Sequence, residues 1–299
     1  MKSYSLGKFE DRSIDSLIEE ASGLPDSAYS SAYQEYSIGL WDTATLWNER
    51  GNESGEVSEH AAAAAPTAIG RSTPRLNEFV RAKFNVDVLR AVRLFRARQG
   101  AIIIPHRDYL EHSNGFCRIH LPLVTTPGAR NSENNEVYRM LPGELWFLDS
   151  NEVHSGGVLD SGTRIHLVLD FTHEHNENPA AVLKNADRLR PIARDPRISR
   201  SKLDHEALES LIRGGRVVTL AMWPALVQML ARIHLTSDAH PAELYDWLDD
   251  LADRSGNDEL VAEARRMRRY FLTDGISRTP SFERFWRELD AARKGELVS

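Results

Sequence analysis

The stretch 102–171 constrains the fold of this chain more than any other segment, because short apolar runs alternate there with turn residues. Within 116–125 almost every second residue is apolar, which would place Arg118 and His120 together on the opposite face of a strand. Several short strands separated by Gly, Pro, Asn and Asp are typical of antiparallel β architectures. The pattern therefore predicts a double-sheet jelly roll or cupin-like barrel, that is, a double-stranded β-helix.

The turn residues also suggest how these strands are connected. One hairpin is expected within 136–148, about the Pro-Gly pair at 142–143. A second is expected within 153–171, about the Asp-Ser-Gly at 160–162. We expect a further turn at 131–135.

Helical periodicity replaces the strand pattern in the last third of the chain. Six helices are expected there: 179–189, 204–213, 217–235, 241–253, 258–271 and 281–294. Near the N-terminus, 13–21 and 74–84 have helical periodicity, and 51–74 has the composition of a loop. The overall prediction is an α+β fold with a barrel domain at 1–190, which includes the N-terminal helices, and a helical C-terminal domain at 191–299.

The bulk properties narrow the function classes. A net charge of −7 gives no indication of nucleic-acid binding. The single cysteine, Cys117, excludes an internal disulfide and favours a reducing compartment. No apolar run has the length of a signal peptide or a membrane span, so we expect a cytoplasmic protein without membrane partners. A homodimer is a candidate assembly.

Three residues form a candidate metal site. His106 and Asp108 are two residues apart at the end of an apolar strand, so their side chains would point the same way. His154 follows a turn, 154 − 108 = 46 residues after Asp108. Two histidines and one carboxylate with open coordination positions form the facial triad of non-haem Fe(II) oxygenases. A structural His106–Asp108 pair is the alternative, and His120 and His166 compete with His154 as third ligand.

Arginines near this triad suggest anionic ligands. Arg164 lies ten residues after His154 on an otherwise apolar strand, and its guanidinium could hold the far carboxylate of a co-substrate. Arg118 and Arg96 are candidates for carboxylates of substrate or co-substrate, and a surface position is the alternative for all three arginines. His120 could bond a co-substrate carboxylate or support the metal ligands.

An aromatic-rich segment precedes the barrel strands. Trp41 or a neighbour within it could form a wall of the substrate pocket, and packing in the core or in a lid is the alternative.

At these residues the sequence resembles the aspartyl/asparaginyl β-hydroxylase superfamily, and within it the bacterial free-proline hydroxylases of the cis-3 type. The similar segments are Ile104-Pro-His-Arg-Asp108, Arg118-Ile-His-Leu121, Pro142-Gly-Glu-Leu-Trp-Phe-Leu-Asp149, Val153-His-Ser155, Glu35-Tyr-Ser-Ile-Gly-Leu-Trp41, Ile233-His-Leu-Thr-Ser-Asp-Ala-His-Pro-Ala-Glu243 and Asp246-Trp-Leu248. The resemblance covers most of the chain, and the C-terminal helical part is its more specific marker.

The resemblance implies Fe(II) bound by His106, Asp108 and His154. It implies 2-oxoglutarate as co-substrate, with its distal carboxylate on Arg164, and O2 as oxidant. It implies hydroxylation of a free amino acid, with L-proline or a cyclic homologue such as L-pipecolate expected first, in peptide natural-product biosynthesis. Asp108 is present, whereas halogenating iron enzymes lack this carboxylate, which favours hydroxylation.

Other readings of the same residues remain open. The substrate could be a non-cyclic or carrier-bound amino acid, and the loops 51–74 and 109–115 would determine that choice. A zinc hydrolase could use the same triad, although the sequence has no HExxH motif. A metal-free small-molecule-binding barrel is the third alternative.

Overall fold

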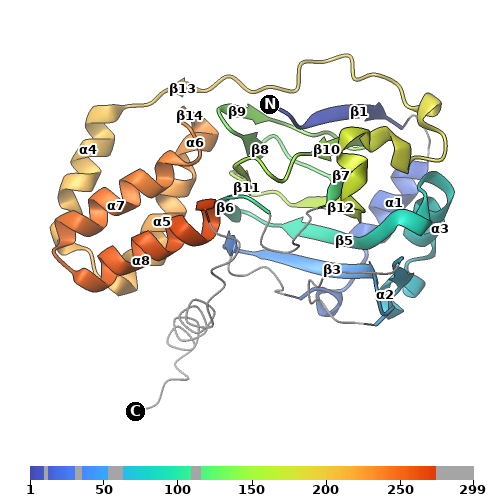
Figure 1. Cartoon of the computed structure of the whole chain (residues 1–299), viewed down its shortest axis with the longest axis horizontal. Helices are drawn as coiled ribbons and strands as arrows, with labels where there is room; N and C mark the ends of the chain where they lie inside the picture. The colour runs from blue at the N-terminus through green and yellow to red at the C-terminus, as the bar shows by residue number, and fades with distance from the viewer. Residues whose placement is uncertain (10–12, 31–35, 53–62, 109–115, 274–299) are drawn as a thin grey trace, which may run out of the picture.

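Two antiparallel sheets face each other and form the barrel on the right of Figure 1. The computed structural model describes residues 1–9, 13–30, 36–52, 63–108 and 116–273. The large sheet has seven strands in the order β1-β10-β7-β12-β5-β3-β4, and the small sheet has five in the order β2-β6-β11-β8-β9. This arrangement confirms the predicted jelly roll.

The strands of the large sheet are β1 (Tyr4–Lys8), β10 (Glu144–Leu148), β7 (Cys117–Val124), β12 (Arg164–Phe171), β5 (Leu89–Ala97), β3 (Trp41–Asn48) and β4 (Ala65–Pro66). Those of the small sheet are β2 (Ser37–Ile38), β6 (Ile102–His106), β11 (His154–Val158), β8 (Ala129–Glu133) and β9 (Glu136–Tyr138).

Helices cover the outer face of the large sheet. They are α1 (Ser13–Ser22), α2 (Ala68–Ser72) and α3 (Pro74–Lys83). Leu17 of α1 and Leu76 of α3 join one buried cluster with Cys117 and Ile119 of β7. Because side chains alternate along a strand, this packing turns Arg118 and its neighbours at every second position toward the barrel interior. The two helices predicted at 13–21 and 74–84 are confirmed as α1 and α3, whereas α2 was not predicted.

A second group of helices packs against the small sheet, on the left of Figure 1. It consists of α4 (His205–Arg213), α5 (Trp223–Ala231), α6 (Ile233–Thr236), α7 (Glu243–Ser255) and α8 (Asp258–Arg268). Ile102 and Ile104 of β6 share a buried cluster with Leu230 and Leu235. The hydroxyl of Tyr245 donates a hydrogen bond to the carbonyl of Pro105, so α7 contacts the strand that ends at His106.

Both predicted hairpins are wrong, because the two strands joined by each turn belong to different sheets. β9 pairs with β8, whereas β10 pairs with β1 and β7. Likewise β11 pairs with β6 and β8, whereas β12 pairs with β5 and β7. The turn residues end the strands as expected, with Gly143 at φ +80°, but the chain crosses between sheets there. The expected turn at 131–135 is also displaced, since β8 continues to Glu133.

Two of the predicted helices are broken by local interactions. Within 179–189 only short 3-10 turns form, because Leu183 pairs with Phe84 in a β-bridge against the barrel. The run 217–235 forms α5 and α6 instead of one helix, and α5 begins only at Trp223, where Pro224, which lacks the N–H of a helix interior, stands in the first turn. The predicted helix 281–294 and the loop 109–115 lie outside the described residues. In the described part of 51–74, β4 and α2 form instead of a continuous loop.

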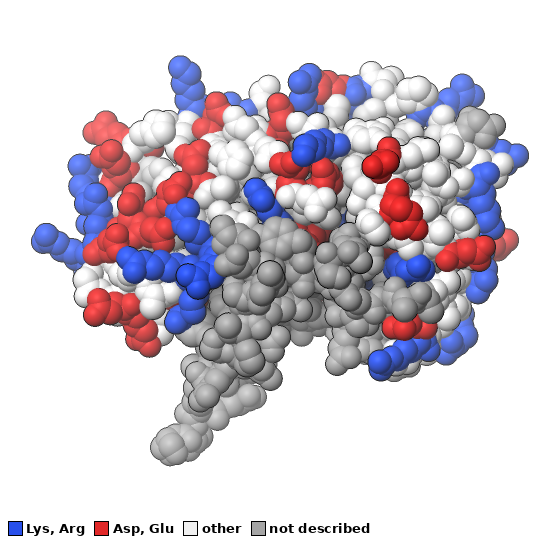
Figure 2. Space-filling view, in the orientation of Figure 1, with Lys and Arg blue, Asp and Glu red and all other residues white. Residues whose placement is uncertain are grey.

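The domain boundary near residue 190 stays a prediction. Helices α4 to α8 begin at His205, after a connector that carries few regular elements. Within the described residues, no helix is both long and apolar enough to cross a bilayer. On the face shown in Figure 2, acidic and basic side chains are interspersed over both the barrel and the helical region.

Candidate active site

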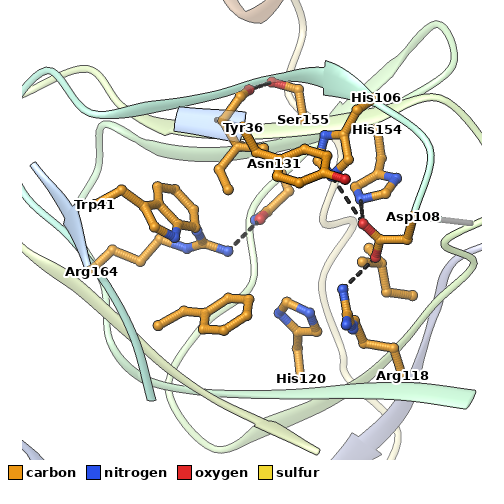
Figure 3. Close-up of a pocket in the computed structure, with 14 residues that line it drawn as sticks. Tyr36, Trp41, His106, Asp108, Arg118, His120, Asn131, His154, Ser155 and Arg164 are labelled. Atoms are coloured by element: carbon orange, nitrogen blue, oxygen red, sulfur yellow. Dashed lines mark hydrogen bonds and ion pairs between the residues drawn. The ribbon is translucent and has the colours of Figure 1, made fainter. Parts of the chain in front are cut away.

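A cavity lies between the two sheets, and it brings together most of the predicted site residues (Figure 3). Polar side chains gather at two places in it, one around Asp108 and one around Arg164. Apolar and aromatic side chains form much of the remaining wall: Tyr36, Trp41, Phe95, Ile103 and Leu148. Such a cavity, apolar with a few convergent charged groups, is the usual form of a small-molecule site.

The predicted metal triad is assembled at one end of this cavity. His106 and His154 are direct partners in the antiparallel pairing of β6 with β11, and Asp108 follows β6 by two residues. One ligand atom from each of the three residues lies within 4.8 Å of the others. Oδ1 of Asp108 is 3.0 Å from Nε2 of His106 and 3.7 Å from Nε2 of His154.

Backbone contacts fix which nitrogen of each ring faces the site. Nδ1 of His106 lies 2.7 Å from the carbonyl of Ile104, and Nδ1 of His154 lies 2.9 Å from the carbonyl of Glu152. A carbonyl accepts only, so each Nδ1 carries a proton that it donates. In the neutral rings each Nε2 then presents a lone pair beside a carboxylate oxygen. These three acceptors fit a divalent cation between them.

The protonation states suit metal binding. Burial, and next the nearby His106, lower the pKa of His154 to about 4, so this ring is neutral at pH 7. Burial by itself would raise the pKa of Asp108. The Arg118 guanidinium, and next His154 where acid protonates it, outweigh that effect and hold the pKa of Asp108 below its ordinary value. The carboxylate is therefore ionised, as a ligand must be.

A ladder of buried ion pairs supports the triad. Arg118 donates through Nη1 to Oδ2 of Asp108 and, through Nε, to Oδ1 of Asp170 at 2.7 Å. Asp170 is fully buried, and it also accepts a hydrogen bond from Arg93. In the register of β12 and β7, Asp170 stands directly opposite Arg118. These ion pairs thus orient the Asp108 carboxylate from the side away from the two histidines.

Arg164 forms a second charged centre. Its side chain is buried, with Nε donating to Nε2 of His166 at 3.0 Å and Nη2 donating to Oδ1 of Asn131 at 2.8 Å. Trp41 lies beside it, with the ring centroid 5.2 Å from the guanidinium carbon. Burial lowers the pKa of Arg164 to about 10, which leaves the group cationic at pH 7. Among the described residues, Nη1 has no hydrogen-bond partner and no carboxylate neutralises the charge, so the centre can bind an anion.

His120 lines the cavity between the two charged centres. Burial, and next the Arg164 charge, lower the pKa of His120 well below 6.5, so the ring is neutral. Its Nδ1 lies 3.3 Å from Nδ1 of His166, and its Nε2 is buried without a partner among the described residues. His166 is itself buried and is not among the residues that line the cavity.

The structure does not bring Arg96 to the cavity. Its guanidinium pairs with Asp42 and Asp26 and lies 3.6 Å above the ring of Tyr29. Phe95 lines the cavity, and the next side chain along β5 points to the opposite face of the sheet. This placement corrects the expectation that Arg96 faces the interior.

Three residues at the site were not singled out from the sequence. Asn131 orients Arg164, Asp170 holds Arg118, and Tyr36 places its ring 4.8 Å from that of His106. Asp170 lies an even number of residues after Arg164 on one strand, so alternation could have placed both on the same face. Asn131 gave no comparable signal.

Comparisons with known proteins agree with this geometry. The family described as "Aspartyl/Asparaginyl beta-hydroxylase" matches residues 12–174, and the family described as "L-proline 3-hydroxylase, C-terminal" matches residues 179–279. An "L-proline cis-4-hydroxylase" of Rhizobium meliloti is 34% identical over 86% of this chain and 91% of its own. An "L-proline cis-3-hydroxylase 2" of a Streptomyces species is 30% identical over 90% and 94%. The predicted family is thereby confirmed.

Among solved structures, a member of the 2OG-Fe(II) oxygenase family from Burkholderia pseudomallei is similar with a TM-score of 0.38 and 12% identity. The match covers 54% of this chain and 77% of that one. A likeness this distant adds nothing to the assignment.

Proposed function

Since the chain belongs to the aspartyl/asparaginyl β-hydroxylase family, we propose that it is an Fe(II)- and 2-oxoglutarate-dependent hydroxylase of a free amino acid. L-proline is the first candidate substrate, because two relatives matched over most of their length are named as L-proline hydroxylases. A cyclic homologue such as L-pipecolate is the second. A role in peptide natural-product biosynthesis stays a prediction from the resemblance.

One observation carries this proposal: a metal-ligand triad opens onto the same cavity as a buried arginine that has no counterion among the described residues. His106, Asp108 and His154 would hold the iron, and the facial triad leaves positions for a chelating co-substrate and oxygen. Bound iron, with 2-oxoglutarate and O2, supplies the oxidising power for hydroxylating an unactivated C–H bond.

The protein's own residues would bind and orient the two organic molecules. Nη1 of Arg164 can form a charge-assisted hydrogen bond with the distal carboxylate of 2-oxoglutarate. Arg118, next to the triad, is the candidate partner for an amino-acid carboxylate. Phe95, Ile103 and Leu148 offer the apolar surface that a pyrrolidine or piperidine ring requires, and they exclude water from the reacting carbon.

The test is succinate formation from 2-oxoglutarate in protein reconstituted with Fe(II) without oxygen and then exposed to air. L-proline, L-pipecolate and a panel of non-cyclic amino acids serve as substrates, with Asp108→Ala as the inactive control. The proposal requires turnover that an amino acid stimulates and that the control abolishes. Zinc-supported hydrolysis, or no metal binding at all, would replace it with one of the alternative readings.

A matched pair of arginine variants separates binding from folding. Arg164→Lys removes the planar guanidinium from the cavity, whereas Arg197→Lys changes an exposed arginine that pairs with Asp195. We expect only the first to raise the KM for 2-oxoglutarate. Equal KM values in the two variants would show that the co-substrate does not bind at Arg164.

A further inference from the structure

Three buried side chains form a continuous line, and both of its ends, Arg164 and His120, line the cavity. Nε of Arg164 lies 3.0 Å from Nε2 of His166, and Nδ1 of His166 lies 3.3 Å from Nδ1 of His120. Arg164 and His166 are two residues apart on β12, and His120 belongs to the adjacent strand β7. His120 faces the cavity, whereas His166 lies behind it with 1% of its surface exposed.

The charge of Arg164 determines where the protons of this line reside. A guanidinium stays protonated and has no acceptor, so its Nε–H can only donate to Nε2 of His166. Burial, and next Arg164 itself, hold the pKa of His166 well below 6.5. The ring is therefore neutral, and its single proton must be on Nδ1.

The Nδ1 proton of His166 has one usable acceptor. Within the described part of the chain, Nδ1 has two polar neighbours, Nη2 of Arg164 at 3.1 Å and Nδ1 of His120 at 3.3 Å. Nη2 belongs to a guanidinium and cannot accept a hydrogen bond, so of these two only Nδ1 of His120 can take the proton. In the opposite tautomer, the Nε2–H of His166 would face the Nε–H of Arg164 at 3.0 Å, which leaves two buried donors in conflict. The Nδ1 tautomer also places an N–H 3.1 Å from Nη2, but that proton has His120 as acceptor while Nε2 accepts from Nε.

We propose that His166 is a positioning residue that fixes His120 as a hydrogen-bond donor, with an Nε2–H group directed into the cavity. Nδ1 of His120 accepts from His166, so the proton of the neutral ring resides on Nε2, the atom without a partner among the described residues. The bound group that it meets is an anionic oxygen, because a fixed donor beside two arginines favours a carboxylate. Only the identity of that oxygen, on 2-oxoglutarate or on the amino acid, rests on the proposed function.

Nitrogen NMR of the metal-free full-length protein reads the tautomers directly. Long-range ¹H–¹⁵N correlations on ¹⁵N-histidine-labelled protein distinguish a ring protonated on Nδ1 from one protonated on Nε2, and His120→Gln and His166→Gln assign the signals. We expect His166 protonated on Nδ1 and His120 protonated on Nε2. A His120 ring protonated on Nδ1, or averaged between tautomers, would overturn the proposal. This measurement needs no turnover, so its result is independent of the proposed function.

A double-mutant cycle then tests whether His166 acts through His120. His166→Leu removes the link, whereas the amide of His166→Gln can accept from Arg164 and donate to His120. We expect His166→Leu to weaken binding of one of the two carboxylates, 2-oxoglutarate or L-proline, roughly five- to tenfold, with kcat less affected, and His166→Gln to restore most of that binding. The double variant with His120→Leu and His166→Leu should bind the carboxylate ligand little more weakly than either single variant. If the losses of binding free energy in the two single variants add up in the double variant, His166 does not act through His120, and the proposal is contradicted.

Discussion

Nη1 of Arg118 donates a hydrogen bond to Oδ2 of Asp108, whereas the nearest carboxylate oxygen to each triad histidine is Oδ1. The two oxygens of one carboxylate therefore have different tasks. Oδ1 faces the position that a metal would take, and Oδ2 is held by a cation. Asp170 holds that cation in turn through Nε and Nη2 of Arg118. A one-oxygen ligand geometry at Asp108 thus depends on a residue that does not touch the metal site.

Replacing Asp170 with Asn should destabilise the fold and weaken metal binding. The change removes a fully buried negative charge that contacts both Arg93 and Arg118. Breaking a buried ion pair costs about 3–5 kcal/mol of unfolding free energy. Because Arg118 loses its anchor, we also expect about tenfold weaker Mn(II) or Fe(II) binding, as is typical for groups that orient ligands. Denaturant unfolding and metal titration measure the two effects.

Asp195→Asn provides the matched control for that change. Asp195 pairs with Arg197 on the surface, and both side chains are more than half exposed. Exposed pairs contribute about 0–1 kcal/mol, so this variant should keep near-native stability and metal affinity. Similar losses in both variants would mean that the buried ladder has no special role.

The face of a strand to which each side chain points could be predicted from the sequence, because the alternation of side-chain direction is a local property of one strand. It placed His106 with Asp108 and Arg118 with His120, and the structure brings all four to the cavity. Arg96 was misplaced because its strand alternates imperfectly, so the sequence did not indicate which face was interior. Its ion pairs with Asp26 and Asp42 depend on the tertiary structure.

Contacts between strands distant in sequence could not be predicted in the same way. Asn131 meets Arg164 because β8 lies in the small sheet, across the barrel from β12. The same limit explains the two wrong hairpins: a turn signal gives the end of a strand but does not indicate whether the next strand pairs with it or crosses to the other sheet.

Gly156→Ala should raise the KM for 2-oxoglutarate without unfolding the protein. A Cβ at this position would lie 3.6 Å from Nη1 of Arg164 and 3.5 Å from Oδ1 of Asn131, which are ordinary contact distances. It would nevertheless occupy space beside Nη1, the nitrogen of Arg164 that has no partner among the described residues. We expect the KM for 2-oxoglutarate to increase roughly five- to tenfold, because about one charge-assisted hydrogen bond to the co-substrate would be lost. Steady-state kinetics with varied 2-oxoglutarate measures it.

The neighbouring glycine offers a control on the opposite face of β11. A Cβ at Gly157 would lie 3.1 Å from Cδ1 of Leu235 and 3.2 Å from the carbonyl of Ala101, against the helical region. Gly157→Ala should therefore lower stability by about 1–3 kcal/mol, as overpacking does, and leave the KM unchanged. A KM effect in Gly157→Ala as large as in Gly156→Ala would contradict this assignment of faces.

Stability should fall as the pH drops from 7 to 5, with His234 contributing measurably. Burial, and next the Arg200 charge, lower the pKa of His234 from 6.5 to about 3, and its Nε2 lies 2.9 Å from Oγ of Ser132. Between these two pKa values the unfolded chain binds a proton that the native state excludes. The contribution of His234 to the unfolding free energy therefore increases with pH across this window. It decreases again as the pH falls.

The histidine contribution can be isolated by comparing two variants. From the shift in pKa, His234 alone accounts for about 2 kcal/mol between pH 7 and pH 5. His234→Gln removes this titration, so its stability should depend less steeply on pH than that of the parent protein, even if it is lower at pH 7. His173→Gln changes a histidine whose side chain is 55% exposed and should keep the parent's dependence. Chemical denaturation of the metal-free proteins at several pH values gives the slopes, and identical slopes for His234→Gln and the parent would show that folding does not lower the pKa of this histidine.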